Sequence, residues 1–407
     1  MRSQALIGLS LLVLACGGGS GSDDPGTTDT ASETPPTGTS TTDTSTTDTS
    51  TTDPSTTDTA TDPGTPWASL DADLVARLDA AVAAAPETIG SPGVALAVVD
   101  LSEHAMWVGS AGLAELDPER PWTPQLPYAI GSVSKTYTTS IVMQLVDEGV
   151  VSLDDPVEDW VSTAWDGQGV TVRHLVQHTS GIVSYNYVGS FDKTGEYTPQ
   201  ELVAWAEKHE PTLRFAPGAQ WEYSNTNFVL LGLIVEQATG GPFEDALQSR
   251  LLTPLGLADT SLPAAYDADL VRGYQSDGKG GLYDATAEGP PSVGWAAGGM
   301  QATPADVAAW GAALFGGDVV SGDRLAEMTT PLVIDGETVG YGLGLFGGID
   351  ADWGASWGHT GGTGGHLTYV YWLEDADAVV VAMVNSFEGD VEDAATLAWI
   401  EVLDLEL

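Results

Sequence analysis

Residues 17–66 contain almost no side chain that a folded core could use, and this limits where the chain can fold. Ser40-Thr41-Thr42-Asp43-Thr44 recurs, with small changes, from Ser45, Ser50 and Ser55, and the stretch has eight Asp, one Glu and no Lys or Arg. Low hydrophobicity with charge of one sign predicts disorder. A flexible chain of this length spans about 40 Å between its ends. We therefore expect a tether over residues 16–66 and a folded domain over residues 67–407.

The first residues have the pattern of an export signal. Arg2 precedes an apolar run over residues 5–15, which is too short to cross a bilayer as a helix. The run ends in Val13-Leu14-Ala15-Cys16, which resembles the lipobox of bacterial lipoproteins. The resemblance implies a signal peptide over residues 1–15 and a lipid on Cys16 that anchors the protein to a membrane. Gly17, in place of Asp, favours the outer membrane, with the domain facing the periplasm or the cell surface; an ordinary signal peptide is the alternative.

The charge of the folded part excludes several classes of partner. Residues 67–407 hold 49 acidic against 11 basic residues, and the whole chain has a formal charge of −46. Nucleic acid and anionic lipid surfaces require clustered Lys and Arg, so neither is expected as a partner. Cys16 is the single cysteine. His174 and His178 are four apart but lack a nearby carboxylate, so we expect capping or core histidines, no metal and no cofactor.

Strand patterns at both ends of the folded part enclose a helical middle. The expected strands are 93–101, 105–111, 342–346, 366–373 and 378–384. The expected helices are 69–85, 132–148, 172–178, 199–209, 225–238, 243–252, 304–314 and one from about residue 391. The order predicts an α+β fold with a sheet lobe built from both ends of the domain and a helical lobe between them.

A Ser-x-x-Lys pattern occurs three times, and its context separates the three. Ser132 and Lys135 open a long apolar helix, where residues three apart share a face, so the amine would lie beside the hydroxyl. The pairs Ser190/Lys193 and Ser276/Lys279 stand among glycines and polar residues in predicted loops. Ser132 is therefore the candidate nucleophile, although a simple helix cap would use the same residue.

A second serine motif has the spacing of a nucleophile site but lacks its context. Ser356 stands in Gly354-Ala355-Ser356-Trp357-Gly358, the spacing of a nucleophile elbow. The glycine-rich stretch that follows cannot form the helix an elbow requires. No acidic residue lies between Ser356 and the later histidines, His359 and His366, so an acid–histidine pair in elbow order is missing.

Two further motifs follow Ser132–Lys135 in the chain. Tyr223-Ser224-Asn225 comes 91 residues after Ser132, and His359-Thr360-Gly361 another 136 residues later. Together the three motifs resemble those of the penicillin-recognising serine hydrolases, closest to the branch of class C β-lactamases, D-alanyl-D-alanine carboxypeptidases and esterases. Further segments that resemble this family are 172–175, 178–181, 223–228, 297–300 and 341–345. The resemblance covers about residues 70–405.

The resemblance implies a role for each motif residue. Ser132 would be the acylated nucleophile, and Lys135 would take or relay its proton. The phenol of Tyr223 would share that role and pass the proton towards the leaving group. Asn225 would hydrogen-bond Lys135 and the substrate amide.

The third motif would complete the site. His359 would keep the local potential positive and assist proton movement, with a charge that depends on pH. The backbone N–H groups of Ser132 and Gly362 would form the oxyanion hole. Thr360 and Gly361 would contribute to substrate binding.

The acyl substrate stays open at this point. A peptidoglycan stem peptide, an ester and a β-lactam all present a carbonyl that Ser132 could open, so a D-Ala-D-Ala carboxypeptidase is expected first, with a carboxylesterase or β-lactamase as alternatives. A binding lipoprotein without catalysis is the alternative of another class.

One feature of the pocket favours uncharged substrates. The related carboxypeptidases hold the terminal carboxylate with an arginine after the 341–345 segment, where this chain has Phe346. Phe346 and Trp295 are expected to form an apolar wall. If a terminal carboxylate is bound after all, Arg272 or Arg173 would have to reach the pocket.

Overall fold

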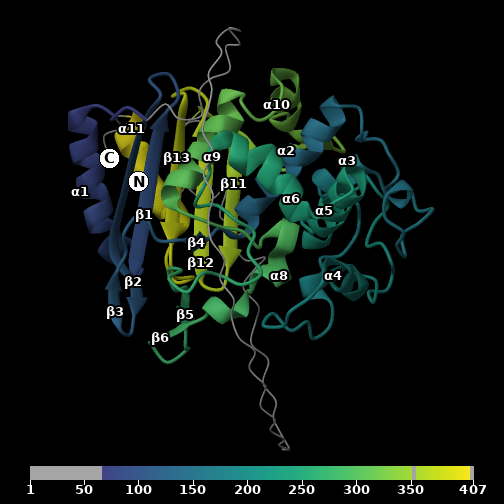
Figure 1. Ribbon diagram of the computed structural model, residues 1–407, viewed down its shortest axis with the longest axis horizontal. Helices are drawn as coiled ribbons and strands as arrows, with labels where there is room; N and C mark the ends of the chain where they lie inside the picture. The colour runs from purple at the N-terminus through teal and green to yellow at the C-terminus, as the bar shows by residue number, and fades with distance from the viewer. Residues whose placement is uncertain (1–66, 351–353, 404–407) are drawn as a thin grey trace, which may run out of the picture. The chain divides into compact units, whose positions relative to one another are not determined.

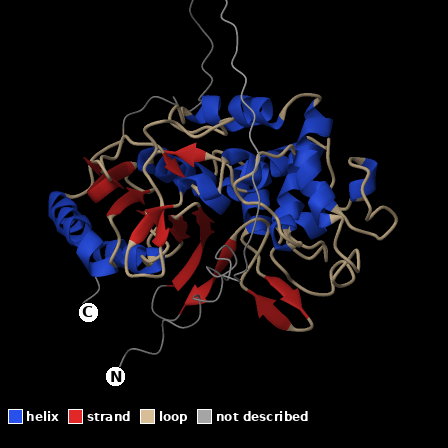
Figure 2. Ribbon diagram, turned by 90° about the horizontal axis from the view of Figure 1, so that it is seen from below, coloured by secondary structure: helices blue, strands red, loops and turns tan. Residues whose placement is uncertain are grey.

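The structure is a computed structural model that describes residues 67–350 and 354–403. The expected signal peptide, Cys16 and the tether lie outside these residues. The described part is an α+β domain in which a large antiparallel sheet is separated from most of the helices (Figures 1 and 2), which confirms the predicted fold class.

The sheet has seven strands in the order β10-β11-β12-β13-β1-β2-β3. Their bounds are β1 Gly93–Asp100, β2 Ala105–Leu116, β3 Glu119–Pro121, β10 Phe346–Asp350, β11 Gly354–Thr363, β12 His366–Leu373 and β13 Ala378–Val384. The central strand pair joins the two ends of the domain, because β1 pairs antiparallel with β13, with Val94 opposite Val384 and Asp100 opposite Ala378. Both strands are buried along almost their whole length, as expected for a sheet covered on both faces.

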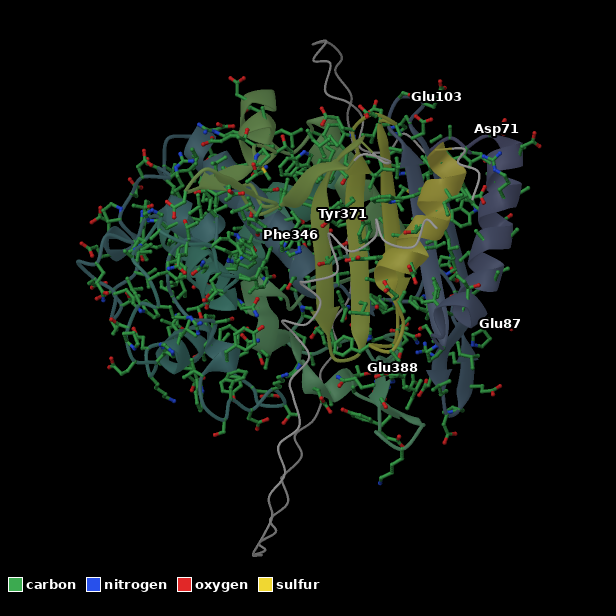
Figure 3. The ribbon with its side chains drawn as sticks, turned by 180° about the vertical axis from the view of Figure 1, so that it is seen from behind. Asp71, Glu87, Glu103, Phe346, Tyr371 and Glu388 are labelled. Carbon is green, nitrogen blue, oxygen red and sulfur yellow. The ribbon has the colours of Figure 1, made fainter. Side chains whose placement is uncertain are left out.

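The two faces of the sheet are covered by different parts of the chain. The terminal helices α1 (Ala72–Ile89) and α11 (Val391–Leu403) pack side by side on one face, as Figure 3 shows. Helix α9 (Pro304–Gly316) packs on the other face against β1, β12 and β13. Each face carries its own cluster of buried apolar side chains, so the sheet is the partition between two cores.

The helical lobe is built around two buried helices, α2 (Ser134–Asp147) and α5 (Asn225–Thr239). Residues 134–143 of α2 and 226–235 of α5 are buried on every side, the pattern of helices at the centre of a lobe. The other helices are α3 Val172–Val176, α4 Pro199–Ala206, α6 Phe243–Leu247, α7 Thr253–Leu255, α8 Pro291–Gly294 and α10 Gly322–Met328. Three short strand pairs are β4 Tyr128–Ala129 with β7 Gln301–Ala302, β5 Tyr274–Ser276 with β6 Leu282–Asp284, and β8 Leu332–Ile334 with β9 Glu337–Val339.

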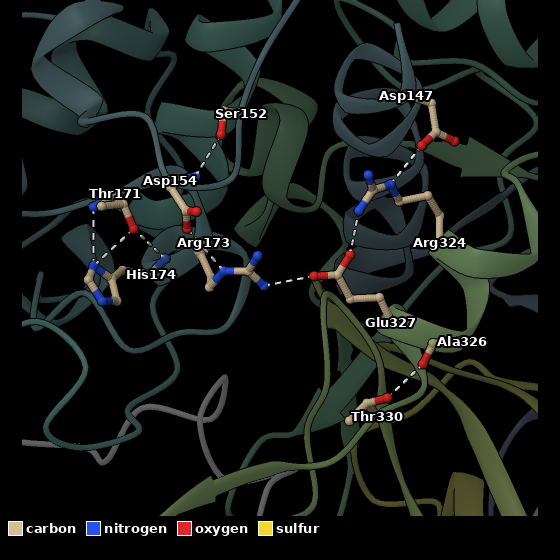
Figure 4. A network of polar contacts seen from close by, with 10 residues as sticks. All are labelled: Asp147, Ser152, Asp154, Thr171, Arg173, His174, Arg324, Ala326, Glu327 and Thr330. Carbon is tan, nitrogen blue, oxygen red and sulfur yellow. Dashed lines mark hydrogen bonds and ion pairs between the residues drawn. The ribbon is translucent and has the colours of Figure 1, made fainter. Parts of the chain in front are cut away.

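A chain of ion pairs fastens α10 to the helical lobe (Figure 4). Arg324 on α10 donates to Asp147 at the end of α2, at 2.7 Å, and to Glu327, at 2.5 Å. Glu327 also accepts from Arg173 on α3, at 2.9 Å, and Arg173 approaches Asp154 at 3.5 Å. The alternation of charges links three helices that are distant in the sequence.

Most predicted elements are present, with three informative differences. The segment 342–345 is not a strand: Gly342 N–H donates to the Leu345 carbonyl, and Gly344 has a φ of +69°, so the chain turns before β10 begins at Phe346. The strand β11 was not predicted, because its six-residue core, Gly358-His359-Thr360-Gly361-Gly362-Thr363, lacks the apolar alternation that marks a strand. Helix α1 starts two residues after the expected cap region, since Asp71, rather than Ser69, accepts from the first helical N–H groups.

Candidate active site

Ser132 lies in the 3-10 turn Gly131–Val133 that leads directly into α2. The turn is stabilised from within, because the hydroxyl of Ser134 donates to the Gly131 carbonyl at 2.7 Å and accepts from the Met300 N–H at 3.2 Å. The side chain of Ser132 is therefore carried by a fixed backbone at the start of a buried helix. Its residual exposure is 9%.

Lys135 is the centre of the site. Its side chain is completely buried, one helical turn after Ser132. The Nζ atom lies 3.1 Å from Ser132 Oγ, 2.7 Å from Asn225 Oδ1 and 2.6 Å from the Ala297 carbonyl oxygen. These three oxygens come from three separate segments of the lobe, so the amine is held in one position.

The second motif forms the wall beside Lys135. Tyr223 is half-buried in the turn that enters α5, and its ring centroid lies 4.8 Å from Lys135 Nζ. Asn225 is the first residue of α5, and its backbone N–H donates to the hydroxyl of Ser184 at 2.8 Å. The predicted group of Ser132, Lys135, Tyr223 and Asn225 is thus brought together.

The third motif lies along a strand edge that faces Ser132. β10 pairs with β11 only up to Gly358. Beyond that point, residues 359–363 pair with β12 along one edge, and their other edge contacts the Ser132 turn. Glycines on both sides allow the contact: a Cβ at 361 would lie 2.1 Å from the Ile130 carbonyl oxygen, and one at 131 would lie 2.7 Å from Gly362 N. This approach brings the backbone at Ser132 close to the backbone at Gly362, and their N–H groups stay the predicted oxyanion hole.

His359 differs from its expected role. The imidazole is buried, with Nδ1 2.5 Å from the Thr360 carbonyl oxygen, while Nε2 is buried without a hydrogen-bond partner. Burial, together with the charge of Lys135, lowers the pKa of His359 to about 3. The ring is therefore neutral at pH 7, and it cannot hold the local potential positive as the sequence suggested.

Of the two residues predicted to form an apolar wall, Phe346 lies at the site and Trp295 does not. Phe346 lies at the edge of the sheet towards the helices (Figure 3), and its ring stacks with Tyr223 at 6.2 Å and meets His359 at 4.9 Å. Trp295 does not line the site: its ring is 7% exposed, packs against Phe243 at 5.4 Å and donates to Glu244 Oε1 at 3.0 Å. Thr360 is half-buried on β11, next to the Gly361 contact.

Arg272 and Arg173, the alternative carboxylate binders, are engaged elsewhere. Arg272 lies 3.8 Å from Glu115 and 3.9 Å from Asp284, and Arg173 pairs with Glu327 and Asp154. Each of the seven arginines in the described ranges has a carboxylate oxygen within 4 Å. They are Arg77, Arg120, Arg173, Arg214, Arg250, Arg272 and Arg324.

The competing serines occupy positions that do not suit a nucleophile. Ser190 is exposed in a loop and Ser276 is exposed at the end of β5. Ser356 lies inside β11, paired with Gly348 and Leu373. His174 closes a capping box with Thr171, as expected for a structural histidine.

Sequence reasoning missed two contributors to the site. The Ala297 carbonyl, which accepts from Lys135, left no signal because any residue can supply a carbonyl. The contact of Ser184 with Asn225 depends on a loop whose path is set only by tertiary packing.

Within the described residues, no group of His, Cys, Asp or Glu is arranged to hold a metal ion. No helix in this part of the chain is both long and apolar enough to cross a membrane.

Comparison with known proteins gives a consistent result. The signature of the family described as Beta-lactamase matches residues 78–403. Penicillin-binding protein 4* of Bacillus subtilis is 27% identical over 304 residues, 71% of this chain and 67% of that protein. Esterase EstB of Burkholderia gladioli is 32% identical over 213 residues, 48% of this chain and 54% of that protein. The crystal structure of a D-stereospecific amidohydrolase from Streptomyces superposes with a TM-score of 0.68 at 32% identity, covering 79% of this chain and 97% of that one.

The buried neutral state of His359 predicts a pH dependence of stability. Its pKa is about 3 in the folded protein and about 6.5 in an unfolded chain. As the pH falls from 6.5 towards 3, the unfolded chain binds a proton that the folded protein does not, so stability is lost. Between pH 7 and pH 5 the free energy of unfolding of His359→Gln should fall by roughly 1–2 kcal/mol less than that of the wild type. Urea unfolding at both pH values measures this difference.

The exposed His104 provides the control. His104→Gln, measured in the same way, removes an exposed imidazole in place of a buried one. Parallel pH curves for His359→Gln and the wild type would show that His359 titrates normally in the folded protein.

Proposed function

This chain belongs to the Beta-lactamase family of serine hydrolases, and we propose that it hydrolyses uncharged amides and esters through an acyl-enzyme on Ser132. The proposal is carried by one observation, the position of Lys135 Nζ between Ser132 Oγ and two further oxygens. The remaining features of the site decide which acyl substrates suit it.

Lys135 is placed to act as the base for Ser132 once its amine has lost a proton. The Ala297 carbonyl and the Asn225 amide oxygen can only accept, and they take two N–H bonds of the amine. Lys135 Nζ donates to Ser132 Oγ at 3.1 Å, and once the amine has lost a proton its lone pair can receive the hydroxyl hydrogen over the same contact. Lys135 would then take the Ser132 proton as Oγ attacks the substrate carbonyl.

The proton balance of the reaction follows from this arrangement. Oγ bonds to the carbonyl carbon, and the N–H groups of Ser132 and Gly362 stabilise the oxyanion. The C–N or C–O bond to the leaving group then breaks, and the proton taken by Lys135 passes by way of the Tyr223 phenol to the leaving atom. A water molecule releases the acyl group in the reverse sense and restores the Ser132 hydroxyl.

The charges around the site argue against a substrate with a free carboxylate. Phe346 occupies the position where an arginine would bind that group, and His359 is neutral. The arginine next to the second motif, Arg214, pairs with Glu222 at 2.9 Å. A charge-assisted contact to a carboxylate contributes roughly 1.5–3 kcal/mol, so its loss reduces affinity about ten- to a hundredfold.

The related proteins agree with more than one class of acyl substrate. The similarity to an esterase and to a D-stereospecific amidohydrolase agrees with ester and amide hydrolysis. The similarity to a penicillin-binding protein supports the second candidate, a D-alanyl-D-alanine carboxypeptidase acting on peptidoglycan stem peptides. Hydrolysis of β-lactams uses the same groups and is the third candidate.

Labelling with a fluorophosphonate tests the catalytic assignment. We expect one adduct per chain, mapped to Ser132 by peptide mass, and none on Ser132→Ala. Lys135→Met, which keeps the side-chain volume, should label at least about 100-fold more slowly because the base is gone. Ser356→Ala should label like the wild type. An adduct on another serine would refute the assignment, and a folded wild type that neither labels nor hydrolyses would indicate a binding protein.

A substrate panel tests the preference for uncharged groups. The panel compares kcat/KM for a short p-nitrophenyl ester, a chromogenic cephalosporin, and a peptide ending in D-Ala-D-Ala with its carboxylate free or amidated. We expect the amidated peptide to exceed the free one by about tenfold or more. Phe346→Arg should narrow or reverse this ratio. A wild-type preference for the free carboxylate would contradict the proposal and favour the carboxypeptidase.

We also propose that the protein is exported and anchored by a lipid on Cys16, since the lipobox-like residues 13–16 precede a tract suited to a tether. Cys16→Ser should leave the precursor unprocessed or release the domain from membranes. The measurement is the mass of the N-terminal peptide from the membrane fraction. A soluble native protein without lipid would refute the anchor.

A further inference from the structure

The turn that carries Tyr223 is bound at two points by His178. Residues 221–224 have no regular secondary structure before α5 begins. The N–H of Glu222 donates to the His178 carbonyl at 3.0 Å, and the N–H of Ser224 donates to His178 Nδ1 at 3.2 Å. His178 thus binds the backbone N–H groups of Glu222 and Ser224, the two residues that flank Tyr223.

The imidazole of His178 also supports the Tyr223 ring. The two ring centroids are 4.4 Å apart. The same imidazole contacts Phe228 at 5.2 Å and Tyr341 at 5.1 Å. Lys135 Nζ lies over the rings of both Tyr223 and Phe228, so His178 backs the aromatic wall that faces the amine.

His178 is itself locked in place. It is completely buried and has a φ of +57°, a left-handed conformation that non-glycine residues rarely adopt. Asn227 donates to the Leu175 carbonyl at 3.2 Å and lies 3.4 Å from His178 Nδ1, and Ser180 donates to Asn227 Oδ1 at 2.8 Å. A strained backbone maintained by a buried network marks a position that packing alone would not select.

The hydrogen bond from Ser224 requires a particular form of the ring. Nδ1 accepts, so the proton of the neutral imidazole is on Nε2. A charged ring would set an N–H against the N–H of Ser224. Burial, reinforced by Lys135 and His359, lowers the pKa of His178 well below its usual value, which agrees with this form.

We propose that His178 is a positioning residue for Tyr223: by binding the N–H groups of both flanking residues and supporting the ring, it aims the phenol at the leaving group. This inference rests on the proposed acyl-enzyme function. His178 touches no reacting atom, so its effect is confined to the proton that Tyr223 delivers. An amide needs that proton for its nitrogen to leave, whereas p-nitrophenolate leaves without it.

Two substitutions that tolerate a left-handed backbone separate the functions of the ring. His178→Asn keeps an acceptor, since Oδ1 takes the place of Nδ1, and asparagine adopts positive φ more readily than other residues. His178→Gly has the same backbone freedom but leaves the Ser224 N–H without its acceptor. Both variants retain the backbone carbonyl that accepts from Glu222.

The experiment measures kcat and KM for an amide and for a p-nitrophenyl ester of the same acyl group. We expect His178→Gly to lower kcat on the amide about 30- to 100-fold with KM little changed, and on the ester less than about 5-fold. His178→Asn should stay within about 5-fold of the wild type on both. Equal losses on amide and ester in His178→Gly would reduce His178 to a structural residue and overturn the proposal.

Two further readouts keep the test decisive. If His178→Gly does not fold, the folded His178→Asn variant decides, because an amide rate reduced more than about 30-fold would refute the acceptor role. Nitrogen NMR of the wild type should show the His178 proton on Nε2 at pH 7; a proton on Nδ1 would refute the clamp. The fluorophosphonate label on Ser132 should persist in every folded variant, and its absence in the wild type would instead count against the proposed function.

Discussion

The site depends on the burial of one amine. Lys135 Nζ is removed from water and shared among the start of α2, the start of α5 and the carbonyl of Ala297. An amine without solvent must find its partners in the protein, so these three segments cannot drift apart without leaving polar atoms unpaired. The same interaction that fixes the helical lobe therefore defines the distance between base and nucleophile.

The geometry of the site also depends on the close approach of two backbone segments. The turn at Gly131 and the strand edge at Gly361 approach until no side-chain atom fits between them. This contact joins the start of the helical lobe to a strand of the sheet lobe, although the two segments are more than 200 residues apart in the sequence. Around it, Phe346, Tyr223 and the neutral His359 form an aromatic boundary without a free positive charge.

The sequence predicted much of this because the relevant signals are local. Strands β12 and β13 begin and end at the predicted residues, since their apolar runs are bounded by turn residues. Ser132, Lys135, Tyr223 and Asn225 come together as expected from the motif order. The failures have physical causes: β11 has four glycines among its ten residues, the charge of His359 depends on burial that no pattern reveals, and Trp295 turns inward at a φ of +40°. The sequence also gave no signal for the role inferred for His178, because its hydrogen-bond partners in the Tyr223 turn are backbone N–H groups, which every residue other than proline carries.

The pairing of β1 with β13 has a consequence for how the protein is made. The hairpin of β1 and β2 is synthesised before the helical lobe, but β13, the partner of its other edge, is synthesised only after that lobe. Until then β1 presents an open apolar edge, which is a site for wrong pairing between nascent chains. A chain that stops before β11 also lacks the strand that packs against the Ser132 turn. Such a truncated chain is a candidate for degradation.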